Sequence, residues 1–235
     1  MKRKIYDNLK KWKDENIQMP YMLVGARQTG KTYILEEFCK NEFENYVYIN
    51  LDKMESVAKI FEQTLEPEEI IKSIEILVNT NIDIENTIIF LDEIQVSERA
   101  ISSLKYFCES SKPYKIVCAG SLLGVKINRF KSSFPVGKVW IEYLYPMDFE
   151  EFLNALGEEK LLQVIKECYV KMEPMLESLH QKALKLYNEY LCIGGMPAVI
   201  AEYIKQDKNI QKMSDDILNI ILTSYMADMA KYTEN

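Results

Sequence analysis

The fold of this chain is decided by the stretch MLVGARQTGKTYIL, residues Met22 to Leu35. Its apolar start is typical of a strand buried on both faces of a sheet, and that run stops at Gly25. A helical pattern begins behind Lys31. Gly25, Gly30, Lys31 and Thr32 match the spacing G-x-x-x-x-G-K-[ST]. A strand before and a helix after are the context in which this spacing forms a phosphate-binding loop.

The residue types in this loop suit a triphosphate. Glycines let backbone N–H groups turn inward around phosphate oxygens, and the amino end of the following helix adds its positive dipole. We expect Lys31 to reach the β and γ phosphates and Thr32 to offer its hydroxyl to Mg²⁺. The residues expected to bind the nucleotide are Gly25, Ala26, Arg27, Gln28, Thr29, Gly30, Lys31, Thr32 and Tyr33.

A second motif, TIIFLDEIQ, supplies two acids at the carboxyl end of an apolar strand, Asp92 and Glu93. We expect Asp92 to hold Mg²⁺ through water, because Mg²⁺ keeps most of its hydration and takes few protein carboxylates. A carboxylate at Glu93 can orient and deprotonate a water in line with the γ phosphate, which favours hydrolysis over transfer to a bound alcohol. The alternative is an acidic pair that only caps the next helix.

A third stretch, KIVCAGSLLG, ends another apolar run with Gly120 and Ser121. Ligands of open α/β sheets lie beyond the carboxyl ends of the strands, so Ser121 should face the same crevice as Lys31 and Asp92. There its hydroxyl would hydrogen-bond the γ phosphate or the attacking water. A serine that only starts a turn is the alternative.

Five short apolar runs alternate with helical patterns in the first part of the chain. The runs cover residues 21–24, 46–51, 87–91, 114–119 and 138–144, and the helical patterns cover 31–43, 67–78 and 97–109. Such alternation predicts βαβ units, and therefore an α/β fold with a mostly parallel five-stranded sheet and helices on both faces. With the phosphate-binding loop after its first strand, this is the core of a P-loop NTPase.

Strand signals fade after Pro146 and helical patterns follow. These patterns begin at Phe149 and continue over 158–172, 175–191, 197–205 and 214–231. We expect a core of residues 1–146, with a helix at 2–13 packed on it, and a helical subdomain of residues 147–235. The last helix lacks a capping glycine or proline, which leads us to expect that the subdomain is truncated at its carboxyl end.

The composition limits the classes of site and partner. The formal net charge is −7, so the summed field repels nucleic acid and anionic lipid. Five scattered cysteines and one histidine leave too few ligands for a zinc site. The odd number of cysteines, without a secretory leader or a long apolar stretch, predicts a cytoplasmic protein with no membrane contact.

Two stretches of the chain are basic although its net charge is negative. In the first, Ile5, Leu9 and Trp12 recur at helical spacing, so we expect an amphipathic helix that packs on the sheet. Contact with an acidic partner or a membrane surface is the alternative. The second stretch carries Lys126, Arg129, Lys131 and Lys138. Such a cluster usually surrounds a triphosphate or stays solvated, so nucleic acid remains open as a partner but is not favoured.

The chain resembles, over nearly its whole length, the prokaryotic AAA-type ATPase family in which a carboxyl-terminal domain of unknown role follows the ATPase core. The resemblance lies in VGARQTGKT, IIFLDEIQ, CAGSLLG, GKVWIEYLYPMDFEEFL and YLCIGGMPAVI. It implies ATP and Mg²⁺ as cofactors, Asp92 and Glu93 as the Walker B pair, and Ser121 at the position called sensor 1. Gly195-Met196-Pro197 is similar to the G-x-P motif of signalling ATPases, in which the proline packs beside adenine. From the residues alone, this segment is a helix boundary.

One departure from the family concerns its arginines. Gly137-Lys138 stands where the family usually has Gly-Arg, and lysine lacks the bidentate geometry with which arginine binds phosphate. Arg129 is a candidate for a finger that reaches a neighbouring subunit, so a homo-oligomer remains open.

Together, these motifs predict an Mg²⁺-dependent ATPase whose cycle moves the helical subdomain. One alternative is a nucleotide-dependent signalling switch with little turnover, and another is a DNA-associated ATPase. A small-molecule kinase is disfavoured, because Glu93 suits water and no second substrate pocket is evident. No guanine-reading N/T-K-x-D motif follows the strands. The protein client is unknown from these motifs.

Overall fold

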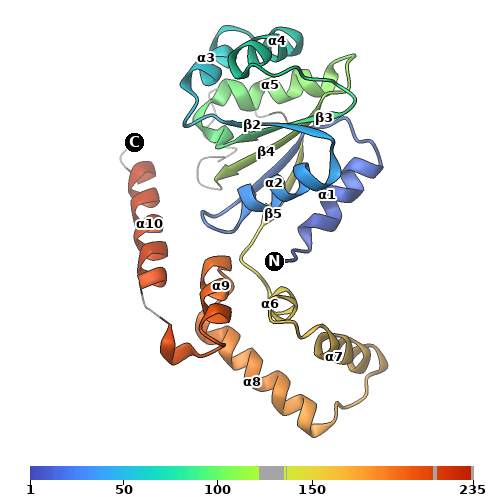
Figure 1. Cartoon of the computed structure of the whole chain (residues 1–235), viewed down its shortest axis with the longest axis vertical. Helices are drawn as coiled ribbons and strands as arrows, with labels where there is room; N and C mark the ends of the chain where they lie inside the picture. The colour runs from blue at the N-terminus through green and yellow to red at the C-terminus, as the bar shows by residue number, and fades with distance from the viewer. Residues whose placement is uncertain (122–134, 136, 214–215, 234–235) are drawn as a thin grey trace. The chain divides into compact units, whose positions relative to one another are not determined.

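The computed structural model describes residues 1–121, 135, 137–213 and 216–233. Contacts within the chain divide it into two compact units. The first, which we call the sheet unit, is Ile5–Leu144. The second, the helical unit, combines Met1–Lys4 with the residues from Tyr145 onward. The chain therefore passes between the two units twice, and Figure 1 shows the elements of each.

The sheet unit is built on five strands. They are β1 (Tyr21–Gly25), β2 (Asn45–Asn50), β3 (Thr87–Asp92), β4 (Lys115–Ser121) and β5 (Trp140–Leu144). Their order across the sheet is β2-β3-β4-β1-β5, and every neighbouring pair is parallel. The predicted α/β fold with a five-stranded parallel sheet is confirmed.

The register of the strands brings their carboxyl ends to one edge of the sheet. Gly25 at the end of β1 lies opposite Ser121 of β4 and Leu144 of β5. At the end of β2, Asn50 lies opposite Asp92 of β3. Because β4 lies between β1 and β3, the loop after β1 and the acids at the end of β3 share this edge.

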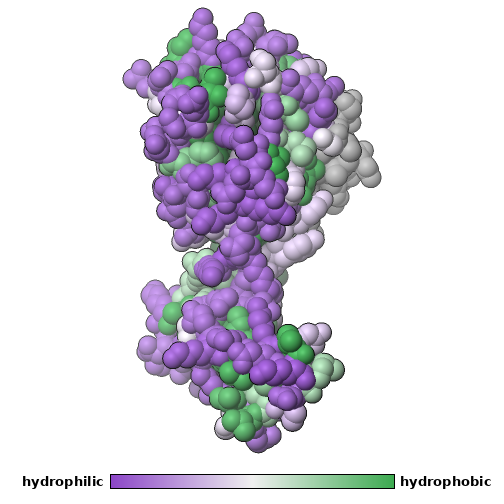
Figure 2. All heavy atoms as spheres, turned by 90° about the vertical axis from the view of Figure 1, so that its right-hand side faces the viewer, coloured by the Kyte–Doolittle hydropathy of each residue, from purple (hydrophilic) through white to green (hydrophobic). Residues whose placement is uncertain are grey.

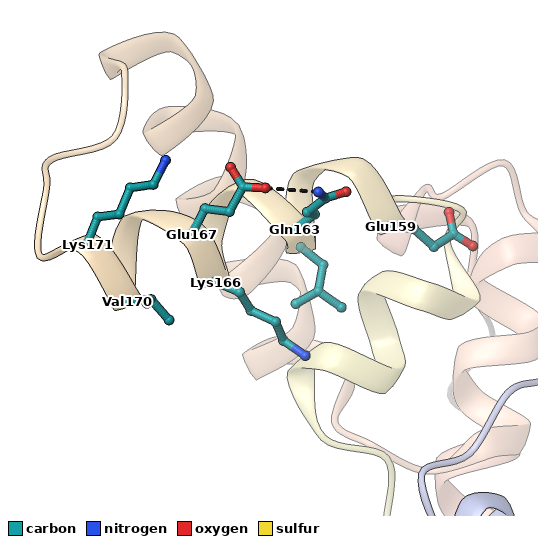
Figure 3. Close-up of a pocket in the computed structure, with 7 residues that line it drawn as sticks. Glu159, Gln163, Lys166, Glu167, Val170 and Lys171 are labelled. Atoms are coloured by element: carbon teal, nitrogen blue, oxygen red, sulfur yellow. Dashed lines mark hydrogen bonds between the residues drawn. The ribbon is translucent and has the colours of Figure 1, made fainter.

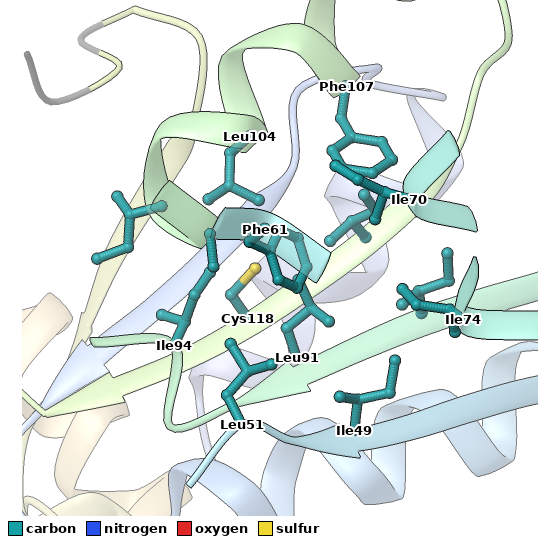
Figure 4. Close-up of a cluster of buried hydrophobic side chains, with 14 of the residues drawn as sticks. Ile49, Leu51, Phe61, Ile70, Ile74, Leu91, Ile94, Leu104, Phe107 and Cys118 are labelled. Carbon is teal, nitrogen blue, oxygen red and sulfur yellow. The ribbon is translucent and has the colours of Figure 1, made fainter. Parts of the chain in front are cut away.

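Helices cover both faces of the sheet. They are α1 (Ile5–Asp14), α2 (Lys31–Glu42), α3 (Glu55–Gln63), α4 (Pro67–Val78) and α5 (Glu98–Glu109). One hydrophobic cluster packs α3, α4 and α5 on one face, as Figure 4 shows, and a second packs α1 and α2 on the other. Alternate strand residues point to opposite faces: Met22 and Val24 lie in the first cluster, Tyr21 and Leu23 in the second. The inner strands β1 and β3 are therefore buried along their whole length, whereas the edge strands β2 and β5 keep exposed positions.

Helix α3 was not predicted from the sequence. It has nine residues and buries Val57, Ile60 and Phe61 against the sheet. Nine residues include too few repeats for the period of 3.6 to stand out from the surrounding polar positions. Helix α4 was predicted, because Pro67 and two glutamates mark its first turn.

The helical unit contains α6 (Phe149–Ala155), α7 (Glu159–Lys171), α8 (Glu177–Ile193), α9 (Pro197–Lys205) and α10 (Asp216–Thr233). Its own core includes Phe152, Val199 and Tyr203. Large apolar side chains lie exposed where α7 leads into α8: Tyr169, Val170, Met172 and Leu176. Figure 2 colours the hydrophobic residues on the visible surface of the molecule green. Within the described residues, no helix is long and apolar enough to cross a membrane.

A buried ion pair attaches the first residues of the chain to the helical unit. Arg3 Nε donates to Glu151 Oε1 over 3.1 Å, and both side chains are almost fully buried. Arg3 Nη2 also donates to the carbonyl of Tyr145 over 2.6 Å. Glu151 accepts from the backbone N–H of Lys4 over 2.8 Å and closes a capping box with Asp148. These hydrogen bonds compensate for the burial of both charges.

Candidate functional site

The loop between β1 and α2 presents an open helix terminus. Gly30 has φ 93°, in the left-handed region where a side chain is strained, and it leads directly into Lys31. No side chain caps α2, which is described over its whole length, and its first turn carries no acid. The first N–H groups of α2 and its positive dipole are therefore directed at whatever binds beyond the loop.

Gly25 is required by a close approach of two backbones. A Cβ atom built on Gly25 would lie 2.3 Å from the carbonyl oxygen of Leu144 on β5, and 3.3 Å from Thr29 Oγ1. The buried hydroxyl of Thr29 in turn donates to the carbonyl of Ala26 over 2.9 Å and fixes the turn. The shape of the loop is thus set by its own backbone and by the neighbouring strand.

Lys31 extends back across the loop. Its Nζ donates to the carbonyl of Gly25 over 3.0 Å and to that of Ala26 over 2.7 Å. The ammonium group is therefore held at the loop, where it adds a full positive charge to the dipole of α2. Together they form a site for an anion.

Thr32 and Asp92 connect the loop to the end of β3. Thr32 Oγ1 lies 3.3 Å from Asp92 Oδ1 and 3.1 Å from Oδ2. Asp92 is 4% exposed, and its carboxylate also accepts from the hydroxyl of Tyr48 over 2.8 Å and from the N–H of Glu93 over 3.0 Å. Three donors compensate for the burial of this charge.

This pair fits Mg²⁺. A hydroxyl and a carboxylate are hard oxygen ligands, and Mg²⁺ is usually bound by one or two such groups together with water and phosphate oxygens. Within the described residues, no group of three or more His, Cys, Asp or Glu side chains could hold a metal ion. A cation at Thr32 and Asp92 would therefore take its remaining ligands from water and from a bound phosphate.

Tyr48 and Asn50 join the site from β2, and sequence reasoning missed both. Asn50 Nδ2 donates to the hydroxyl of Tyr48 over 3.4 Å, and Tyr48 donates to Asp92. Partial burial and the hydrogen bond to Asp92 raise the pKa of Tyr48, so it remains a donor. The available signal was that polar residues occur near the end of a predicted strand, but nothing indicated which strand lay beside it.

Glu93 and Ser121 are linked through Gln95. Gln95 Nε2 donates to Glu93 Oε2, and the N–H of Ser121 donates to Gln95 Oε1 over 3.1 Å. The structure therefore brings Glu93 close to the end of β4, as it brings Thr32 to Asp92. Sequence reasoning gave Gln95 no role, although it stands two residues after Glu93 in the same motif.

Comparison with known proteins identifies the family of this chain. A family model described as an AAA domain matches residues 18–153, which is more than half of the chain. The chain belongs to the AAA domain family. The resemblance read from the sequence is therefore confirmed. None of the curated proteins compared with this AAA chain matches it.

Two solved structures share the fold of this AAA chain. A Walker-type ATPase of Pyrococcus abyssi is 15% identical to this chain, with a TM-score of 0.56. The match covers 99% of this chain and 75% of the Pyrococcus chain. The replication initiator DnaA, bound to AMPPCP and single-stranded DNA, is 15% identical with a TM-score of 0.50. That match covers 88% of this chain and 61% of DnaA, so the AAA chain spans less than two thirds of DnaA.

Pro197 lies in the helical unit of the AAA chain, at the first turn of α9. The glycine before it also has a structural reason. A Cβ atom on Gly195 would lie 2.1 Å from the carbonyl oxygen of Met147, whose N–H donates to the carbonyl of Gly195 over 2.6 Å. The segment therefore joins α9 to the start of the helical unit, and contact between Pro197 and adenine stays a prediction.

Replacing Gly195 with alanine is expected to destabilise the helical unit by about 1–3 kcal/mol, because the added methyl group meets backbone atoms that no side-chain rotation can move. Thermal or urea unfolding of the variant measures this change. Gly157→Ala is the matched control. Gly157 has φ 76° but nothing within 4 Å of an added Cβ, so only backbone strain of about 1 kcal/mol is expected there. Equal losses in the two variants would contradict the proposed contact.

Three of the predicted basic residues, Lys126, Arg129 and Lys131, lie outside the described residues. The assignment of Arg129 as a finger therefore stays a prediction. Lys138 is described, and its Nζ pairs with Glu109 Oε1 over 3.1 Å on the surface of the sheet unit. Such an exposed pair adds little stability.

The helical unit has a hollow of about 430 Å³, and none of the loop and strand-end residues described above lines it. Figure 3 shows that its lining side chains come from α7, where Gln163 donates to Glu167 over 2.9 Å. A hollow lined by a single helix lacks the convergent polar groups of a ligand site. We therefore assign the candidate site to the loop and strand ends of the sheet unit.

Proposed function

We propose that this AAA chain binds ATP together with Mg²⁺ and hydrolyses it. The observation that carries the proposal is the contact of Thr32 with buried Asp92, directly beside the open amino end of α2. A phosphate site and a divalent-cation site then adjoin one another, as transfer of a γ-phosphoryl group requires.

Each residue has a proposed role. The N–H groups of the loop and Lys31 bind phosphate oxygens, and Thr32 and Asp92 hold Mg²⁺. Bound Mg²⁺ supplies positive charge that offsets the charge developing on the phosphates. Glu93 accepts a proton from water as the water oxygen bonds to the γ phosphorus. The bond to the β–γ bridging oxygen breaks, and ADP leaves with that electron pair. The hydroxyl of Ser121 hydrogen-bonds the γ phosphate.

ATP is proposed in preference to GTP on two grounds. The sequence lacks the guanine-reading motif, and the DnaA structure that shares this fold is bound to AMPPCP. By the family resemblance, Pro197 would pack beside the adenine ring.

Movement of the helical unit during the cycle is also proposed, and one segment supports it. Leu144 lies against Gly25 of the loop, and three residues further on Met147 pairs with Gly195. A change in the loop would therefore be transmitted along a chain segment that is held by backbone contacts at both ends.

A nucleotide-dependent switch with little turnover is the second candidate. It is favoured by Lys138, which stands where the family usually has arginine and which pairs with Glu109. Lysine keeps the positive charge but lacks the bidentate geometry of arginine, so it stabilises the transition state less well. A DNA-associated ATPase is a third candidate, since DnaA in the related structure is bound to DNA.

Phosphate release from ATP and from GTP, measured side by side with Mg²⁺ and with or without DNA, tests the proposal. We expect release from ATP that stops when EDTA removes Mg²⁺, slower release from GTP, and no change with DNA. ATP that stays bound without phosphate release would select the switch, and release that requires DNA would select the third candidate. Failure to bind either nucleotide would contradict all three.

A further inference from the structure

Gln95 lies in a short turn that is fixed on both sides. The turn is the 3₁₀ helix η1 (Ile94–Val96), directly after β3. Ile94 is fully buried in the cluster shown in Figure 4. The N–H of Val96 donates to the carbonyl of Glu93 over 3.0 Å, and the N–H of Ser97 donates to the carbonyl of Ile94 over 3.2 Å. The backbone that carries Gln95 therefore has little freedom, and its side chain starts from a fixed point.

The contacts of Gln95 need an amide. A backbone N–H such as that of Ser121 can only donate, and an ionised carboxylate such as that of Glu93 can only accept. Gln95 meets both requirements, because Oε1 accepts from Ser121 and Nε2 donates to Glu93. The same two contacts decide which end of the amide is oxygen and which is nitrogen.

Glu93 itself has an uncommon backbone conformation. Its φ is 53°, in the left-handed region that residues other than glycine rarely adopt. Such strain persists where the surroundings hold it, and it is concentrated at functional sites. The backbone of η1 and the amide of Gln95 supply that support, so the carboxylate of Glu93 is aimed by its neighbours.

We infer that Gln95 is a positioning residue, which holds the carboxylate of Glu93 in the orientation that activates water and ties it to the N–H of Ser121. The inference rests on the proposed hydrolysis and extends it, because it names what holds the base. It also connects Glu93 to β4, the strand between the phosphate loop and Asp92. A catalytic group must be held to within a fraction of an ångström, and supporting hydrogen bonds do this.

Gln95→Met tests the inference, because methionine fills a similar volume without either hydrogen bond. We expect kcat for ATP hydrolysis to fall by about 10- to 100-fold, while the Kd for ATP with Mg²⁺ changes by less than about threefold. Gln95→Glu should lose at least as much, since a second carboxylate repels Glu93. Val96→Ala is the matched control: this half-exposed neighbour in the same turn should keep the wild-type kcat.

A double variant separates positioning from mere structural support. In the Glu93→Gln background, adding Gln95→Met should change kcat by less than about twofold, because Gln95 acts through Glu93. The same loss in both backgrounds would overturn the inference. A lower Tm together with weaker ATP binding would also overturn it. If the wild-type chain hydrolyses ATP and the Gln95→Met variant does so at the same rate, the inference is refuted but the proposed function stands. Absent wild-type turnover would refute the proposed function together with it.

Discussion

Replacing Glu93 with glutamine is expected to leave ATP binding unchanged and to lower kcat by about 10²- to 10⁴-fold. Glutamine has nearly the same shape as glutamate, and its amide oxygen can still accept from Gln95. It is not basic enough to take a proton from water. The residues that hold the phosphates and Mg²⁺, from Gly25 to Thr32 and at Asp92, are untouched by the change. Phosphate release and calorimetric titration with ATP and Mg²⁺ measure the two quantities separately.

Glu98→Gln is the control for this prediction. Glu98 is an exposed acid in the first turn of α5, a few residues after Glu93 on the same segment, and its loss should leave both quantities at wild-type values. If Glu93→Gln hydrolyses ATP at the wild-type rate, the assignment of the base is wrong. If it loses binding as well, Glu93 supports the site rather than the chemical step.

Replacing Lys31 with alanine should act on binding itself. Loss of a charged donor to the β and γ phosphates is expected to raise the Kd for ATP with Mg²⁺ by at least about 30-fold. Stability should change little, because Lys31 is only partly buried and its hydrogen bonds to the carbonyls of Gly25 and Ala26 are of modest net strength. Titration with ATP measures the first effect and thermal unfolding the second.

Lys40→Ala gives a matched control on the same helix. Lys40 is exposed near the end of α2 and pairs with Glu36 over 2.6 Å. Its removal changes the net charge by the same amount as Lys31→Ala but should leave the Kd unchanged. Equal Kd values for the wild type and Lys31→Ala would show that the triphosphate is not bound by this loop.

Much of the sheet could be predicted from sequence because its inner strands, β1, β3 and β4, are buried on both faces. Continuous apolar runs marked the first four strands, a fifth run at 138–144 marked β5, and the loop motif marked the junction of β1 and α2. The order of strands across the sheet could not be read in this way. It depends on which neighbours pack best, and the roles of Tyr48 and Gln95 depend on that order.

The reasons for two glycines were also hidden in the sequence. Gly25 was expected to be needed for the path of the loop around phosphate, and Gly195 was expected at a helix boundary. In the structure, each allows a close backbone approach, to Leu144 and to Met147 respectively. Contacts between residues so far apart in the chain leave no local pattern, because they arise only when the chain is folded.

A crystal structure of the chain with AMPPCP and Mg²⁺ tests the central claim most directly. We predict phosphate oxygens within about 2.7–3.2 Å of the N–H groups that begin α2 and of Lys31 Nζ. Thr32 Oγ1 should lie about 2.0–2.1 Å from the metal, with Asp92 beside it. A nucleotide bound elsewhere, with Lys31 still donating to the carbonyls of Gly25 and Ala26, would contradict the claim.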